Sequence, residues 1–148
     1  MQKLVLIGAI ILAGVLGTVV YLRIAHQAPM DGVEVTWEML GQLDYITGKA
    51  GSELEALDGH GVKIPGFMVP LEDSQQSVTE FLLVPTPQAC IHVPPPPPNQ
   101  MVYITMKEGT AVAFGPIWVH GRLKITPKKH MYGEASFEVE GVSVEPYR

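Results

Sequence analysis

Hydrophobic and polar positions divide the chain into an apolar start, a short linker and a longer mixed region. Residues 4–22 form an apolar run without charge, LVLIGAIILAGVLGTVVYL, between Lys3 and Arg23. As a helix this run would reach roughly 28 Å, enough to cross the hydrocarbon core of a bilayer. It is long for a cleaved signal peptide, and no clear cleavage site follows it. We expect an uncleaved signal anchor, a transmembrane helix over residues 1–23, with a cleaved signal peptide as the alternative.

A linker over residues 24–35, broken by Pro29 and Gly32, leads into the first element of the domain. Thr36 is typical of a helix N-cap, because its hydroxyl can accept a hydrogen bond from the backbone two or three residues later. Apolar residues between positions 37 and 46 then share one helical face. The pattern predicts one helix of about ten residues that ends near Gly48. Residues 52–57 could add a helical turn.

From Gly59 onward the apolar positions alternate, as they do in strands. The expected strands cover residues 62–71 (bent at Pro65 and Gly66), 78–84, 101–106, 117–125, 135–139 and 142–145, with turns at 107–110 and 124–129. Short strands with frequent turn residues indicate an all-β barrel or sandwich. We expect a mainly β fold for residues 36–148: a small OB-like (oligonucleotide/oligosaccharide-binding) barrel with one N-terminal helix. An immunoglobulin-like sandwich fits the tryptophan and cysteine spacing poorly.

The charge balance restricts partners and compartment. The 148 residues carry 15 acidic and 10 basic side chains, a formal net charge of −5. Nucleic acid binding needs a basic patch that neutralises phosphates, so we expect no nucleic acid partner. The short flanks of the apolar run differ little in positive charge, and the acidic domain favours export. We expect a single-pass protein of the bacterial inner membrane with its soluble domain in the periplasm.

The single cysteine lies two residues before a histidine, in Cys90-Ile91-His92. Neighbours two apart on an extended chain point to the same side, so this thiol and imidazole could bind zinc, or else copper. Two ligands do not complete a site, and His60 and His120 are the first candidates for a third. We place His120 on the outer, exposed face of its strand. The alternative is a cysteine that only fills the core.

A run of prolines follows this pair directly and ends in two amides. The candidate interaction residues are Pro94, Pro95, Pro96, Pro97, Pro98, Asn99 and Gln100. Five prolines favour a polyproline II rod of about 15 Å. Such a rod can brace its own domain as a strut, or it can dock in an aromatic groove of another protein. The second possibility gives the alternative function, an interaction module that engages a membrane transporter.

An enzyme is not expected. A cysteine and histidine can form a nucleophilic pair, but a third orienting group and a glycine-rich elbow are not evident near Cys90 and His92. The accessory, non-catalytic functions are favoured.

Several segments together resemble an exported bacterial family known as domain of unknown function 3299. They are GVKIPGFMVPLE at 61–72, TEFLLVP at 79–85, ACIHVPPPPPNQ at 89–100 and PIWVHGRL at 116–123. The resemblance covers roughly Trp37 to the end of the chain, and the proline-rich block is its most specific part. It implies a secreted or membrane-tethered periplasmic protein of the kind that accompanies transporters or metal-responsive systems.

Overall fold

The computed structural model describes residues 14, 17, 32–87 and 94–147. The expected anchor over residues 1–23 therefore lies almost wholly outside the described residues, as do Cys90 and His92. Within the described part of the chain, no helix is long and apolar enough to cross a membrane.

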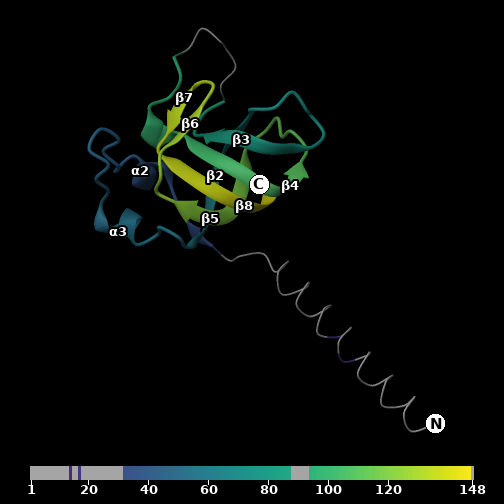
Figure 1. Ribbon diagram of the computed structural model, residues 1–148, viewed down its shortest axis with the longest axis horizontal. Coiled ribbons are helices and arrows are strands. Elements are labelled where there is room, and N and C mark those ends of the chain that lie inside the picture. The colour runs from purple at the N-terminus through teal and green to yellow at the C-terminus, as the bar shows by residue number, and fades with distance from the viewer. Residues whose placement is uncertain (1–13, 15–16, 18–31, 88–93, 148) are drawn as a thin grey trace, which may run out of the picture.

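Five strands of the described chain close into a barrel (Figure 1). They are β2 (Gly61–Pro70), β3 (Val78–Val84), β4 (Val102–Thr110), β5 (Ile117–Lys124) and β8 (Phe137–Pro146). The order around the barrel is β2-β3-β4-β8-β5, and β5 returns to β2. Strands β4 and β8 are parallel, whereas the other neighbours within the barrel are antiparallel. The expectation of a mainly β barrel is confirmed.

Barrel closure depends on β2, which pairs with a different neighbour in each half. Gly61 to Gly66 pair with β5, and Phe67 to Pro70 pair with β3. At the changeover, a Cβ on Gly66 would lie 2.7 Å from the carbonyl oxygen of Val84 and 2.8 Å from Cγ of Leu83. Only glycine fits there, so the Pro65-Gly66 step of the sequence marks the position where the strand changes partner.

The barrel interior is filled by every second residue of the strands. Its largest fully buried side chains include Ile64, Phe81, Leu83, Ile104, Leu123 and Phe137. Met68 is 8% exposed and belongs to the same cluster, so its side chain fills the core. Leu40 and Leu54, from outside the barrel strands, also belong to the cluster and are fully buried.

Shorter elements surround the barrel. Strand β1 (Val33–Glu34) pairs in parallel with β2 and lies within the segment that the sequence suggested as linker. Helices α2 (Trp37–Leu40) and α3 (Ser52–Glu55) lie together at one side of the barrel (Figure 1). The 3₁₀-helix η1 (Pro98–Gln100) precedes β4, and β6 (Lys128–His130) forms a hairpin with β7 (Gly133–Ala135).

The expected single helix is wrong in its length. Thr36 does cap α2, because its Oγ1 accepts a hydrogen bond from the N–H of Met39 at 3.3 Å, but the helix ends at Leu40. The Asp44 carboxylate accepts hydrogen bonds from the N–H groups of Ile46 and Thr47, and such local bonds compete with helix formation. Gly48 has a φ of +72°, which ends any helical path. The single turn of α2 replaces the expected helix of about ten residues, and α3 lies within residues 52–57, where a helical turn was expected.

Two strand limits also differ from expectation because of long-range pairing. Strand β4 continues through the expected turn at 107–110, since Thr110 pairs with Val78 of β3. The two expected C-terminal strands form one strand, β8, whose pairing with β5 shifts register between His120 and Gly121. The expected turn at 124–129 is likewise shorter, because Lys128 and Lys129 belong to β6. Lys124 and Lys128 form ion pairs with Glu140 and Glu138.

We predict that Leu40→Ala lowers the free energy of unfolding by about 2–4 kcal/mol, because it removes a fully buried side chain that joins α2 to the barrel. Ile46→Ala is the control, since Ile46 is 84% exposed and its truncation should change stability by no more than about 0.5 kcal/mol. Urea unfolding of the full chain in mild detergent, followed by circular dichroism, measures both. Equal losses in the two variants would contradict the packing described for α2.

Candidate interaction surface at the polyproline segment

The proline run is fastened to the domain at its C-terminal end. The backbone N–H of Ser136, which follows β7, donates a hydrogen bond to the carbonyl of Pro98 at 2.9 Å. The N–H groups of Gln100 and Met101 donate to the carbonyls of Pro97 and Pro98, forming the single turn of η1. Since Met101 leads directly into β4, the end of the run is held to the barrel frame.

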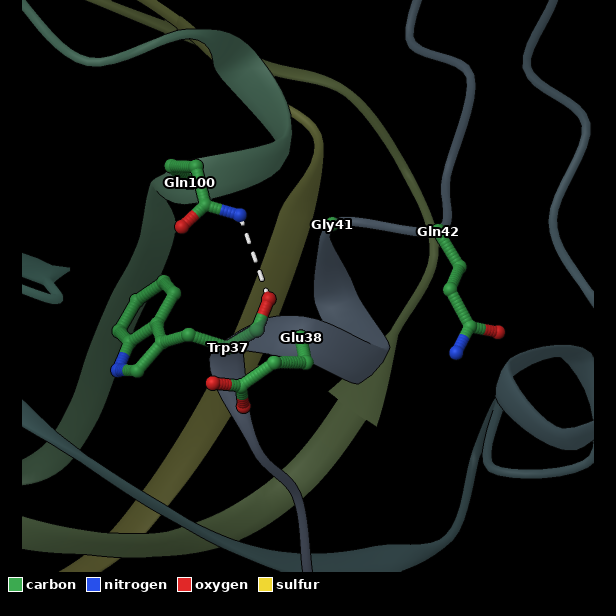
Figure 2. A pocket seen from close by; sticks show the side chains of 5 residues that line it. All are labelled: Trp37, Glu38, Gly41, Gln42 and Gln100. Atoms are coloured by element: carbon green, nitrogen blue, oxygen red, sulfur yellow. Dashed lines mark hydrogen bonds between the residues drawn. The ribbon is translucent and has the colours of Figure 1, made fainter.

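The two amide side chains after the prolines fasten this end to α2. Asn99 Nδ2 donates hydrogen bonds to the carbonyl oxygens of Gly41 at 3.2 Å and Leu43 at 3.0 Å. Gln100 Nε2 donates to the carbonyl oxygen of Trp37 at 3.3 Å (Figure 2). The Trp37 carbonyl, in the first residue of α2, also accepts the N–H of Gly41 at 2.9 Å, whereas Gly41 and Leu43 lie at and beyond the C-terminal end of the helix. Asn99 and Gln100 therefore fix the rod beside α2.

The prolines before η1 are largely open to solvent. Pro94, Pro95 and Pro97 are exposed, while Pro96 is partly buried. A polyproline II helix has three residues per turn, so positions 94 and 97 share one face, 95 takes a second and 96 a third. Among residues 94–97 the domain partly covers only Pro96, and Pro94, Pro95 and Pro97 are accessible.

A shallow depression of about 500 Å³ lies beside this fastening point. It is lined by Trp37, Glu38, Gly41, Gln42 and Gln100, and Figure 2 shows these residues around the end of α2. Trp37 is held in place because its Nε1–H donates to the carbonyl oxygen of Pro65 at 2.6 Å. Gln100, which follows the prolines, lines this depression together with residues of α2, so the depression adjoins the C-terminal end of the proline run.

A second apolar cluster covers the outer face of β3 and β4. It consists of Leu82, Val84, Met101, Tyr103 and Ala135, the last of them from β7. Ala135 is fully buried, so part of the β6–β7 hairpin packs onto this outer face. Burial, followed by the hydrogen bond to Glu80, raises the pKa of Tyr103. The chain thus covers much of this barrel face with its own hairpin.

The hairpin carries His130 against this face. The His130 and Tyr103 ring centroids are 6.3 Å apart, and Nδ1 of His130 accepts a hydrogen bond from the N–H of Tyr132 at 3.2 Å. Because Nδ1 is an acceptor, the neutral ring has its proton on Nε2, which is buried and has no hydrogen-bond partner among the described residues. Burial lowers the pKa of His130.

The two histidines expected as metal ligands lie apart. His60 is exposed directly before β2, where its backbone carbonyl accepts a hydrogen bond from the N–H of Leu123. His120 pairs with Lys63 of β2. Lys63 is three residues after His60, which places the two histidines roughly 10 Å apart. Within residues 32–87 and 94–147, no group of three or more histidine, cysteine or acidic side chains is arranged to hold a metal ion. Ligation by Cys90 and His92 stays a prediction.

His120 lies on the outer face of β5, as expected, but its exposure was predicted wrongly. Its side chain is only 12% exposed, and its Nε2 lies 3.8 Å from the Glu145 carboxylate. Within the part of the chain that the structure describes, both ring nitrogens are buried without a hydrogen-bond partner, as is Oγ of Ser143, the residue paired with His120 on β8. Alternation gives the face on which a residue lies, but it cannot give the cover that neighbouring strands supply.

Sequence reasoning identified the prolines, Asn99 and Gln100, but it missed the residues to which they bind. Gly41 and Leu43 are 58 and 56 positions from Asn99, and Trp37 is 63 positions from Gln100. The bonds use backbone carbonyls, which carry no signal in the sequence. The only available sign was the pair of amides after the prolines, since both need hydrogen-bond partners.

Comparisons with known proteins agree on one family. The family model for DUF3299, a protein of unknown function, matches residues 19–146. A crystal structure of a DUF3299 family protein from Pseudomonas aeruginosa PAO1, at 2.45 Å resolution, is similar with a TM-score of 0.64. The two chains are 35% identical, and the match covers 79% of this chain and 97% of the other. A comparison with curated proteins found no match. The resemblance based on the sequence motifs is confirmed.

We predict that His130 makes stability depend on pH. The pKa of a histidine in an unfolded chain is about 6.5, and burial lowers the folded pKa below this value. The unfolded chain then binds the proton more tightly. The contribution of His130 to the free energy of unfolding should therefore be fully present above about pH 6.5. It should be lost as the pH falls through that value toward the folded pKa. Protonation also costs the hydrogen bond from the Tyr132 N–H, because Nδ1 would then carry a proton.

His130→Gln should reduce the loss of melting temperature between about pH 7.5 and about pH 5.5. His60→Gln, at an exposed position, is the control and should retain the pH dependence of the parent. Thermal melts of the full chain at several pH values measure the difference. Parallel pH profiles for His130→Gln and the parent would show that His130 does not couple protonation to folding.

Proposed function

We propose that this chain, which belongs to the DUF3299 family of proteins of unknown function, is a membrane-anchored accessory protein of the bacterial periplasm that binds a partner protein through its polyproline segment. The partner is a transporter or another membrane protein. The observation that carries this proposal is that the rod is fixed at one end while Pro94, Pro95 and Pro97 remain exposed.

A fixed polyproline segment has a physical advantage as a ligand. Its backbone conformation is already restricted before binding, so little conformational entropy is lost when it docks in an aromatic groove. Fastening by Asn99 and Ser136 adds to this restriction because it also limits the direction in which the prolines point. A strut would instead bury most faces of the rod, whereas here the domain covers mainly Pro96.

We further infer that the barrel is of the OB type. The strand order β2-β3-β4-β8-β5, closed by β2, with a parallel pair between the third and fifth strands, supports this assignment. Barrels of this type commonly bind oligonucleotides or oligosaccharides on the face of their second and third strands. The equivalent strands here are β3 and β4, where the hairpin packs Ala135. The covered face and the acidic charge favour a protein partner that binds elsewhere.

Membrane anchoring rests on the apolar run over residues 4–22. A helix of this length matches a bilayer, and β1 begins only at Val33. The residues between them would keep the barrel within a few tens of ångströms of the membrane, because extended chain spans at most about 3.5 Å per residue. That distance suits a domain whose partner is embedded in the same membrane.

Replacement of Pro94, Pro95 and Pro97 by alanine should abolish partner contact with little effect on the melting temperature, because these residues are exposed. Contact can be followed in cells of the native host with the photo-crosslinker p-benzoylphenylalanine in place of Pro95. We expect a discrete adduct of the full chain with one membrane protein. The same crosslinker at Glu108, an exposed residue of β4, serves as the control and should not give this adduct.

Two results would contradict the proposed function. Identical adducts from positions 95 and 108 would mean that the prolines do not select the partner. A large drop in melting temperature in the triple alanine variant would mean that the rod is a structural strut.

A transition metal at Cys90 and His92 is the second candidate function. It is supported by the spacing of the two residues and by their position just before the fastened rod, where a bound ion would fix the other end of the segment. Zinc is the first choice and copper the second, since a thiolate and an imidazole suit both. Of the other candidate ligands, His60 is exposed and accessible, whereas the side chain of His120 is largely buried.

Titration of the purified full chain with zinc and with copper tests this candidate. We expect close to one equivalent bound, lost in both Cys90→Ser and His92→Ala and retained in His130→Gln, which removes a histidine whose Nδ1 is already engaged. Unchanged affinity in Cys90→Ser would remove this residue from any metal site. Individual His60→Ala and His120→Ala variants identify the third ligand.

A further inference from the structure

Negative charge is concentrated in the segment that precedes the barrel strands. Residues 32–60, here called the helical lobe, contain β1, α2 and α3 and carry one lysine, Lys49, against six acidic residues. The acidic residues are Glu34, Glu38, Asp44, Glu53, Glu55 and Asp58. This gives the lobe a formal charge of −5, whereas residues 61–87 and 94–147 have eight acidic and six basic residues, or −2.

The two regions also differ in how their carboxylates are compensated. On the barrel, Glu138 and Glu140 form ion pairs with Lys128 and Lys124. In the lobe only Glu34 has such a partner among the described residues, Lys63 of β2. Backbone and hydroxyl hydrogen bonds lower the pKa of Glu38 and Asp44, so both stay ionised at neutral pH. The lobe is therefore an acidic surface with little internal compensation.

The helical lobe also carries an exposed apolar pair. Tyr45 is 47% exposed and Ile46 is 84% exposed, in the turn after α2. The Asp44 carboxylate accepts the Ile46 N–H at 2.9 Å, and an isolated β-bridge joins Asp44 to Lys49, so the turn holds both side chains outward. Two neighbouring large apolar side chains kept in water carry an unfavourable hydration cost that a docked partner would remove.

This apolar pair is continuous with the surface of the polyproline segment. The carbonyl oxygen of Leu43, two residues before Tyr45, accepts a hydrogen bond from Asn99 at the end of the prolines. The depression lined by Trp37, Glu38 and Gln42 lies at the same end of α2 (Figure 2). A partner seated on the prolines would therefore meet the lobe next.

We propose that the helical lobe docks a basic segment of the partner protein, with an apolar side chain of that segment against Tyr45 and Ile46 and its cationic side chains among the lobe carboxylates. This inference rests on the proposed function and names the chemistry of the partner. Charge complementarity selects the occupant. Nucleic acid and an anionic membrane surface are negatively charged like the lobe, so both would be repelled. A second copy of the chain would place another lobe of charge −5 against the first and would also be repelled.

The test uses the full chain in detergent micelles and a short fluorescein-labelled peptide of lysine and leucine in amphipathic helical order. Fluorescence anisotropy should show saturable binding that weakens as sodium chloride is raised, because exposed charges are screened by salt. A matched peptide with glutamate in place of lysine should not bind. Absence of binding by the lysine peptide would overturn the proposal.

Two variant pairs separate docking from net charge. Glu53→Gln with Glu55→Gln removes two lobe charges and should weaken the peptide Kd by about tenfold, as expected from two exposed ion pairs of up to about 0.7 kcal/mol each. Asp73→Asn with Glu108→Gln changes the net charge equally at exposed positions outside the lobe and should alter Kd by less than about twofold. Equal changes of Kd in the two variant pairs would mean that the peptide responds only to the net charge of the protein, and this result would overturn the proposal.

Ile46→Ser tests the apolar contact and should weaken the Kd by about fivefold through lost apolar burial. An unchanged Kd would exclude Ile46 from the docking site. The triple alanine variant at Pro94, Pro95 and Pro97 should keep its peptide affinity. If the parent chain gives the adduct from position 95 but does not bind the lysine peptide, lobe docking is refuted and the proposed function stands. If the parent chain binds the peptide but gives no adduct from position 95, the proposed function alone is refuted.

Discussion

The double pairing of β2 is the constraint on which the remaining structure depends. Because this strand pairs with β5 in one half and β3 in the other, the barrel closes, and Gly66 supplies the space needed at the changeover. Closure fixes the carbonyl of Pro65, which accepts the hydrogen bond from the Trp37 indole. Helix α2 is thereby attached to the barrel, and the carbonyl groups of Trp37 in α2 and of Leu43 after it hold Gln100 and Asn99.

This chain of contacts gives the proline run an unusual combination of order and exposure. The run has no N–H groups of its own and cannot join a sheet, so its position is set by the residues that follow it. Two amides and the N–H of Ser136 provide that position, and three of the prolines still face solvent. The acidic lobe next to it adds charge and two exposed apolar side chains. The proposed binding of a partner depends on this rigidity, apolar contact area and charge.

Much of the barrel could be predicted because its information is local. Alternating apolar residues gave β2, β3 and β5 nearly to the residue, and the Pro65-Gly66 step gave the bend. The cap at Thr36 was also readable, since it depends on residues three apart. Helix length was mispredicted because the Asp44 side chain competes for backbone N–H groups, which periodicity does not register. The extension of β4 needed the distant pair of Val78 and Thr110.

The candidate site was predictable only in part for the same reason. The proline run and its amides are visible in the sequence, but their partners are main-chain carbonyls more than fifty residues away. The number of acidic residues in 32–60 can also be counted from the sequence. Which carboxylates form ion pairs depends on the folded arrangement, so the sequence does not show which of them stay uncompensated. The burial of His120 likewise follows from strands that pack beside it and not from its own neighbours.

The most direct test of this account measures the order of the proline rod. Spin labels on cysteines at Pro95→Cys and Glu55→Cys, in a Cys90→Ser background, report the distance between the rod and α3 by pulsed electron paramagnetic resonance. The account predicts one narrow distance distribution, which broadens when Asn99→Ala removes the hydrogen bonds to Gly41 and Leu43. A broad distribution that Asn99→Ala leaves unchanged would contradict a rod fixed to the domain.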